Sequence, residues 1–76
     1  EYAGLNIDVL QKLAETSGVT DITPEILRDH GLLGKNDLLK VLGRGILKNT
    51  ISVTANAFSE KAIQAIESVG GTVIKL

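Results

Sequence analysis

The alternation of hydrophobic and polar positions near the C-terminal end predicts a strand, a helix and a second strand. Apolar and polar residues alternate over residues 51–55, as in a strand with one buried face. Ser59 then suits the N-cap of a helix whose apolar residues recur at helical spacing over residues 62–69. Two glycines end this helix, and residues 72–76 form the last strand. Since a helix between two strands favours parallel pairing, we expect a C-terminal right-handed βαβ unit.

The first half of the chain predicts one short edge strand and two helices. Residues 2–7 form the edge strand. Asp8 suits an N-cap with Gln11 as its capping-box partner, ahead of an apolar helical face that ends at a glycine. The second helix begins at residues 23–25, because Thr caps, Pro needs no N–H at the first helical position, and Glu favours the positive helix end.

The middle of the chain predicts a strand followed by a tight turn. Residues 38–42 are apolar apart from Lys40, and residues 43–45 contain two glycines that permit positive φ. The complete expected order is β-α-α-β-β-α-β. The sequence therefore predicts an α/β fold in one small layered domain that spans residues 1–76.

The composition then narrows the class of function. Of the 76 residues, 43% are hydrophobic and 22% are charged, as in a globular domain. Without cysteine, the chain has no disulfide, no thiolate zinc site and no Cys nucleophile, and the single His30 excludes a His-rich metal site. No apolar run approaches the roughly 20 residues of a membrane helix. We therefore expect no catalytic residue, no metal or cofactor, and no membrane contact.

The charged residues are distributed unevenly along the chain. The whole chain carries a net charge of -1, but residues 1–34 carry -4 and residues 35–48 carry +3. The cations of the basic segment have no structural role in the predicted fold, which makes them candidates for phosphate contacts. These cations are Lys35, Lys40, Arg44 and Lys48.

Residues 31–34 contain a literal GXXG, the pattern of the loop with which KH domains clamp a nucleic-acid backbone. The two central residues, Leu32 and Leu33, prefer burial. A helix stop followed by a core contact is therefore favoured over a KH loop. The spacing of a P-loop is missing as well.

The residues from 40 to 70 carry a more specific pattern. The segment Lys-Val-Leu-Gly-Arg-Gly-Ile-Leu over residues 40–47 leads into Ile-Ser-Val-Thr-Ala-Asn-Ala-Phe-Ser over residues 51–59, followed by Ala62, Ile66 and Gly70. This pattern closely resembles the C-terminal signature of the bacterial-type large-subunit ribosomal protein fifteen family. The resemblance continues upstream and downstream and covers nearly the whole chain.

This resemblance implies a structural constituent of the large ribosomal subunit, in a cytoplasmic or an organellar ribosome. Members of the family bind large-subunit ribosomal RNA and neighbouring ribosomal proteins, and they support subunit assembly without acting on a small-molecule substrate. The family usually has a long basic N-terminal arm that is absent here. We therefore expect residues 1–76 to be the C-terminal part of a longer chain and a monomer when isolated. Asn56 stands where a histidine is common in the family, and Ile46 where a charged residue is common.

Three kinds of group are expected to contact RNA phosphates: cationic side chains, backbone N–H groups of the turn at residues 43–45, and the helix start at Ser59. The predicted RNA-binding residues are Lys35, Lys40, Gly43, Arg44, Gly45, Lys48 and Ser59. The acidic first half is expected to face solvent or a basic protein neighbour. The alternative is a protein-interaction module without RNA binding, which would agree with the net charge of -1.

Phe58 and Ile63 are expected to be structural residues that do not face RNA. Phe58 precedes the Ser59 cap, and Ile63 lies where a hydrophobic staple would meet it. Their spacing places both side chains at the start of the last helix, on its buried side.

Overall fold

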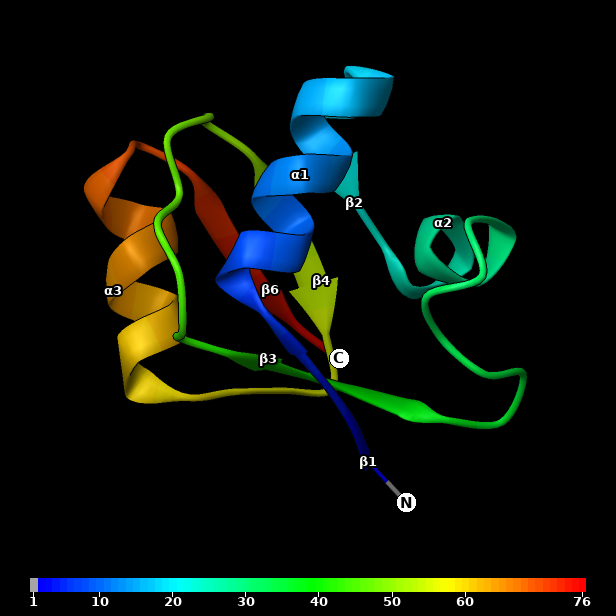
Figure 1. Cartoon of the computed structure of the whole chain (residues 1–76). Helices are drawn as coiled ribbons and strands as arrows, with labels where there is room; N and C mark the ends of the chain where they lie inside the picture. Colours follow the sequence, from blue (N-terminus) through cyan, green and yellow to red (C-terminus); the bar gives the residue numbers. More distant parts are fainter. Residues whose placement is uncertain (1) are drawn as a thin grey trace.

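Two three-stranded sheets, each built of parallel strands, form the framework of the fold (Figure 1). The computed structural model describes residues 2–76. Sheet A contains β1 (Tyr2–Asn6), β3 (Leu38–Leu42) and β5 (Ala57–Phe58), in that order. Sheet B contains β2 (Asp21–Ile22), β4 (Ser52–Ala55) and β6 (Thr72–Lys75), also in that order. The helices are α1 (Ile7–Ser17), α2 (Pro24–Asp29) and α3 (Glu60–Ser68).

The predicted α/β class and the parallel pairing of the C-terminal unit are confirmed, because β4 and β6 pair in parallel with α3 between them in the chain. The expected element order was incomplete, since it lacked the two-residue strands β2 and β5. Two residues are too few to show a period of their own. Both strands form because a longer strand offers them a parallel edge, β4 for β2 and β3 for β5.

Asn56 carries the chain from one sheet to the other, because β4 and β5 are consecutive in sequence but lie in different sheets. Its backbone N–H donates to the Leu39 carbonyl at 3.0 Å, and its side-chain Oδ1 accepts from the Leu39 N–H at 2.9 Å. One residue thus satisfies both backbone groups of Leu39. The amide of Asn56 therefore has a structural role where the chain passes between the two sheets.

The observed helix ends can be compared with the cap residues predicted from the sequence. Thr23 accepts a hydrogen bond from the Ile26 N–H with Pro24 at the first helical position, and Ser59 accepts one from the Ala62 N–H, so both predicted N-caps are confirmed. Gly18 ends α1 in the left-handed conformation, with φ +74°. The predicted capping box of α1 is wrong: its N-cap is Asn6, whose side chain makes no cap hydrogen bond.

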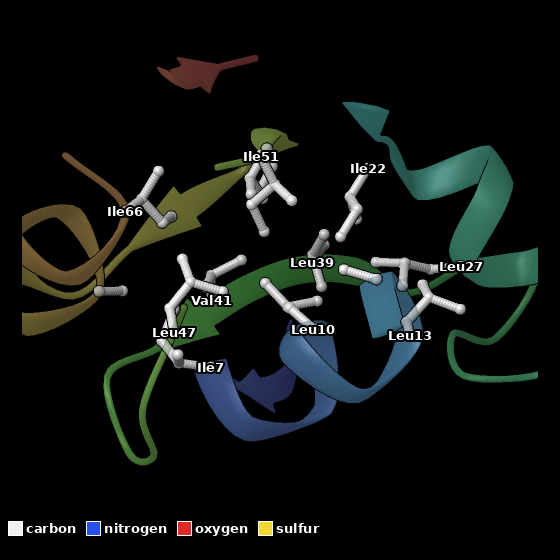
Figure 2. Close-up of a cluster of buried hydrophobic side chains, with 14 of the residues drawn as sticks. Ile7, Leu10, Leu13, Ile22, Leu27, Leu39, Val41, Leu47, Ile51 and Ile66 are labelled. Atoms are coloured by element: carbon white, nitrogen blue, oxygen red, sulfur yellow. The ribbon is translucent and has the colours of Figure 1, made fainter. Parts of the chain in front are cut away.

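The hydrophobic core lies between α1, the inner face of sheet A and sheet B (Figure 2). Leu10 of α1 points toward Leu39 of β3, and Leu13 points toward Leu27 of α2. Ile66 of α3 closes the core at one end and Leu27 of α2 at the other, and the side chains of both are completely buried. None of the helices in residues 2–76 lies on the outer face of sheet A (Figure 1). Within residues 2–76, no helix is long and apolar enough to span a membrane.

Phe58 is half-buried and packs against this core, in agreement with its predicted structural role. Ile63 is also only half-buried.

Replacing Phe58 by alanine should lower the free energy of unfolding by about 1–2 kcal/mol, less than for a fully buried ring, because part of the ring stays in water. Urea unfolding measures this loss. An unchanged midpoint would show that the ring contributes nothing to the core.

Candidate nucleic-acid interface

Three of the predicted RNA-binding residues, Gly43, Arg44 and Ser59, line one surface hollow. It lies where the end of β3 meets the start of α3, and its lining residues are Leu42, Gly43, Arg44, Ser59, Glu60 and Lys61. We refer to it as the basic hollow. A Cβ atom on Gly43 would collide with the Cβ of Lys61, so only glycine allows β3 and α3 to approach this closely.

Lys61 is a cation of this hollow that the sequence did not single out. It is exposed and occupies the second helical position of α3, directly after Glu60. A positive charge near a helix N-terminus is unfavourable for the helix dipole. Its unfavourable position at the helix start could have marked Lys61 as a candidate for phosphate binding, because the cation has no role in stabilising the helix.

The turn at the end of β3 is held by the start of α1. Asn6 Oδ1 accepts from the Arg44 N–H at 3.2 Å, and the Asp8 N–H donates to the Arg44 carbonyl at 3.2 Å. Gly45 has φ +112°, and a Cβ atom there would collide with Asp8. The Arg44 N–H therefore already has a partner, which leaves the exposed guanidinium as the group that Arg44 offers to a phosphate.

Gln11 fixes the other end of the same segment. Its Oε1 accepts from the N–H groups of Lys48 and Asn49 at 2.8 and 3.1 Å. Its Nε2 donates to Asn49 Oδ1 at 2.9 Å and to Glu15 Oε2 at 2.7 Å. The side chain is 7% exposed, and these four hydrogen bonds use its full capacity. Gln11 therefore joins α1 to the loop 38 residues further along the chain.

Residues 43–49, which we call the basic arch, are thus fastened to α1 at both ends. Figure 1 shows this green segment passing between α1 and α3. The side chain of Leu47 is buried, whereas Arg44 and Lys48 are exposed. Ile46 is 73% exposed at the middle of the arch. The fastening presents two cations and one aliphatic side chain outward from a fixed backbone.

Lys40 and Lys35 lie apart from the basic hollow. Lys40 is exposed on the outer face of sheet A, between Gly4 of β1 and Ala57 of β5. Lys35 is exposed in the loop that precedes β3. The predicted residues therefore do not form a single cluster.

The loop that carries Lys35 is braced from inside by Arg28. Its Nε donates to the Gly34 carbonyl at 3.2 Å and its Nη2 to the Asp37 carbonyl at 3.1 Å. Leu33 of the GXXG segment is buried and Leu32 is 37% exposed, so this segment follows a helix stop with a core contact, as favoured above. Among residues 2–76, no three His, Cys, Asp or Glu side chains gather in a way that could hold a metal ion.

Comparison with known proteins identifies the family. The family described as ribosomal proteins 50S-L15, 50S-L18e and 60S-L27A matches residues 4–74. The chain is similar to three proteins named large ribosomal subunit protein uL15. The one from Amoebophilus asiaticus (strain 5a2) is 50% identical over 70 residues, which cover 92% of this chain and 46% of that protein. The one from Bacteroides thetaiotaomicron is 45% identical over 76 residues, or 100% of this chain and 51% of that protein. The one from Koribacter versatilis (strain Ellin345) is 48% identical over 71 residues, or 93% of this chain and 46% of that protein.

The chain thus spans about half the length of the curated relatives it matches. The names of the family and of these relatives describe ribosomal proteins and no enzyme. Because the family match extends over nearly the whole sequence, the chain belongs to the family of ribosomal proteins 50S-L15, 50S-L18e and 60S-L27A.

Proposed function

We propose that this protein is a structural constituent of the large ribosomal subunit. It binds large-subunit ribosomal RNA through the basic hollow and the basic arch, contacts neighbouring ribosomal proteins, and supports assembly of the subunit. The observation that carries the proposal is the convergence of Arg44, Lys61 and Ser59 on one hollow at the start of a helix.

The geometry of the basic arch favours binding to a polyanion. Arg44 and Lys48 project from a backbone that Asn6 and Gln11 already hold in place. A preorganised segment loses less conformational entropy on binding than a flexible one, so more of each phosphate contact contributes to affinity. The start of α3 adds its positive dipole end to the cations of the hollow.

Exposed carboxylates limit the extent of the proposed interface, and one of them, Asp8, packs against Gly45 of the basic arch. Asp8, Glu15, Asp21, Glu25 and Asp29 are all exposed on or beside α1 and α2. Carboxylates repel phosphates, so the carboxylates of this set away from the basic arch face solvent or a basic neighbouring protein rather than RNA. The module without RNA affinity remains the competing function, and a binding titration separates the two.

Replacing Lys40, Arg44 and Lys48 together by glutamate should abolish binding of the 76-residue chain to purified large-subunit ribosomal RNA. Each neutralised phosphate contributes roughly 0.7–0.9 to the slope of log K against log salt. Contacts from all four cations of the basic segment, Lys35, Lys40, Arg44 and Lys48, would therefore yield a slope of no more than about 3.6. With so few contacts the affinity at physiological salt should be about micromolar or weaker. Titrations at several salt concentrations measure both quantities.

Lys12→Glu is the control for charge reversal, because Lys12 is exposed on α1 near the carboxylates. It should change the RNA affinity little. Arg28 is unsuitable as a control, since its side chain braces a loop. If the triple variant keeps the affinity and the salt slope of the unmodified chain, the basic arch does not contact RNA, and the protein-interaction module becomes the better explanation.

A further inference from the structure

The outer face of sheet A is an open surface with a distinctive set of side chains. Along β1 and β3, alternate residues pack into the core, so the residues between them face outward. Figure 1 shows α1 above these strands and no helix below them. The outward residues at the centre of this face are Tyr2, Gly4, Leu38, Lys40 and Ala57.

The register of the strands surrounds the positive charge of Lys40 with small residues. Lys40 lies between Gly4 and Ala57, which have little or no side chain. Tyr2 lies beside Leu38 at the neighbouring outward position, and these two side chains are 55% and 40% exposed. Lys40 is the only charged residue in the three strands of sheet A.

The same face is continuous with the basic hollow. Leu42 follows Lys40 by two residues along β3 and lines the hollow together with Arg44. A ligand that lies along β3 would therefore meet the guanidinium of Arg44 at one end and the ring of Tyr2 at the other.

We propose that the outer face of sheet A docks a single-stranded segment of RNA, with a base stacked on Tyr2 and a phosphate bound by Lys40. This inference rests on the proposed RNA-binding function and names the kind of RNA that this face accepts. An unpaired strand offers the two groups that the face is equipped to meet, because its bases can stack on an aromatic ring while its phosphates pair with cations. Within the described strands of sheet A, this face carries one positive charge and no carboxylate, which complements a polyanion and not a basic protein.

Tyrosine fluorescence provides a direct test of the stacking contact. Tyr2 is the only tyrosine of the chain, and there is no tryptophan, so the intrinsic emission reports this one ring. We expect a single-stranded oligoriboadenylate to quench this emission on binding. Inorganic polyphosphate, which has the charges but no bases, should bind without quenching it.

Variants separate stacking from electrostatics. Tyr2→Leu should weaken binding of the oligoriboadenylate about 5- to 20-fold without changing the salt slope, because stacking releases no counterions. Tyr2→Phe should retain the affinity. Lys40→Gln should lower the slope by about 0.7. Ile74→Ala, which removes a 43% exposed aliphatic side chain from the other sheet, is the control and should have no effect.

The possible outcomes distinguish this inference from the function on which it rests. If Arg44→Glu and Lys48→Glu weaken RNA binding but Tyr2→Leu and the fluorescence show no change, the stacking inference is overturned and the proposed function stands. If neither charge reversal affects RNA binding, both are overturned. A dimer in sedimentation that Tyr2→Leu dissociates would assign this face to a second copy of the chain and would also overturn the inference.

Discussion

Replacing Gln11 by leucine should lower the free energy of unfolding by about 2–4 kcal/mol. The side chain is 7% exposed, and its Oε1 is the hydrogen-bond acceptor for the N–H groups of Lys48 and Asn49. Leucine fills a similar volume but accepts no hydrogen bond. A donor left without a partner costs about 1–3 kcal/mol, and the lower part of this range applies because both N–H groups are only partly buried. In a domain of this size, the loss should lower the melting temperature by roughly 10–25 °C.

Gln64→Leu is the matched control, because Gln64 is the other glutamine of the chain and is exposed on α3. An exposed substitution of this kind should change the free energy of unfolding by no more than about 0.5 kcal/mol. Thermal unfolding followed by circular dichroism compares the two variants. Equal melting temperatures would show that the four hydrogen bonds of Gln11 do not hold the basic arch.

Replacing Gly43 by alanine should lower the free energy of unfolding by about 3 kcal/mol and weaken RNA binding as well. The new Cβ would meet the Cβ of Lys61 and also the backbone of Lys61 and Ala62, which cannot move without displacing α3. Forcing atoms into a packed contact typically costs 1–3 kcal/mol, and a contact with backbone lies at the upper end of this range. The same displacement moves Lys61 and Ser59 away from Arg44, so the basic hollow opens.

Gly4→Ala introduces the same methyl group in β1 as a control. There the Cβ would approach only the end of the Leu42 side chain, which can rotate away. Urea unfolding should show a loss below about 1 kcal/mol for this control. If both variants lose equal stability, the loss follows from replacing a glycine in general and not from the contact between β3 and α3.

The position of Gly43 also explains why part of the interface could be recognised in the sequence and part could not. Gly43, Arg44 and Ser59 stand out locally, as a glycine turn, a cation without a structural role and a helix cap. Lys61 joins them only because β3 and α3 pack closely at Gly43. Lys35 and Lys40 are equally basic in the sequence, yet the fold places them in a different loop and on a different face.

The amino-acid sequence by itself determined the elements whose start and stop signals are local. Thr23, Ser59 and Gly18 each act within a few residues of their own helix end, and all three do so as predicted. The strands at residues 38–42 and 72–75 have enough apolar residues to be recognised without their partners.

Only the tertiary structure decided the contacts between segments far apart in the chain. Gln11 was predicted to cap its own helix but instead accepts hydrogen bonds from the backbone of Lys48 and Asn49. Asn56 accepts a hydrogen bond from the Leu39 N–H, 17 residues earlier in the chain. A side-chain amide can satisfy either a local or a distant backbone group, and its own sequence neighbourhood does not distinguish them. Packing of the core decides between the two, because it brings α1, β3 and the basic arch together and an amide that loses contact with water must bind the polar groups within its reach.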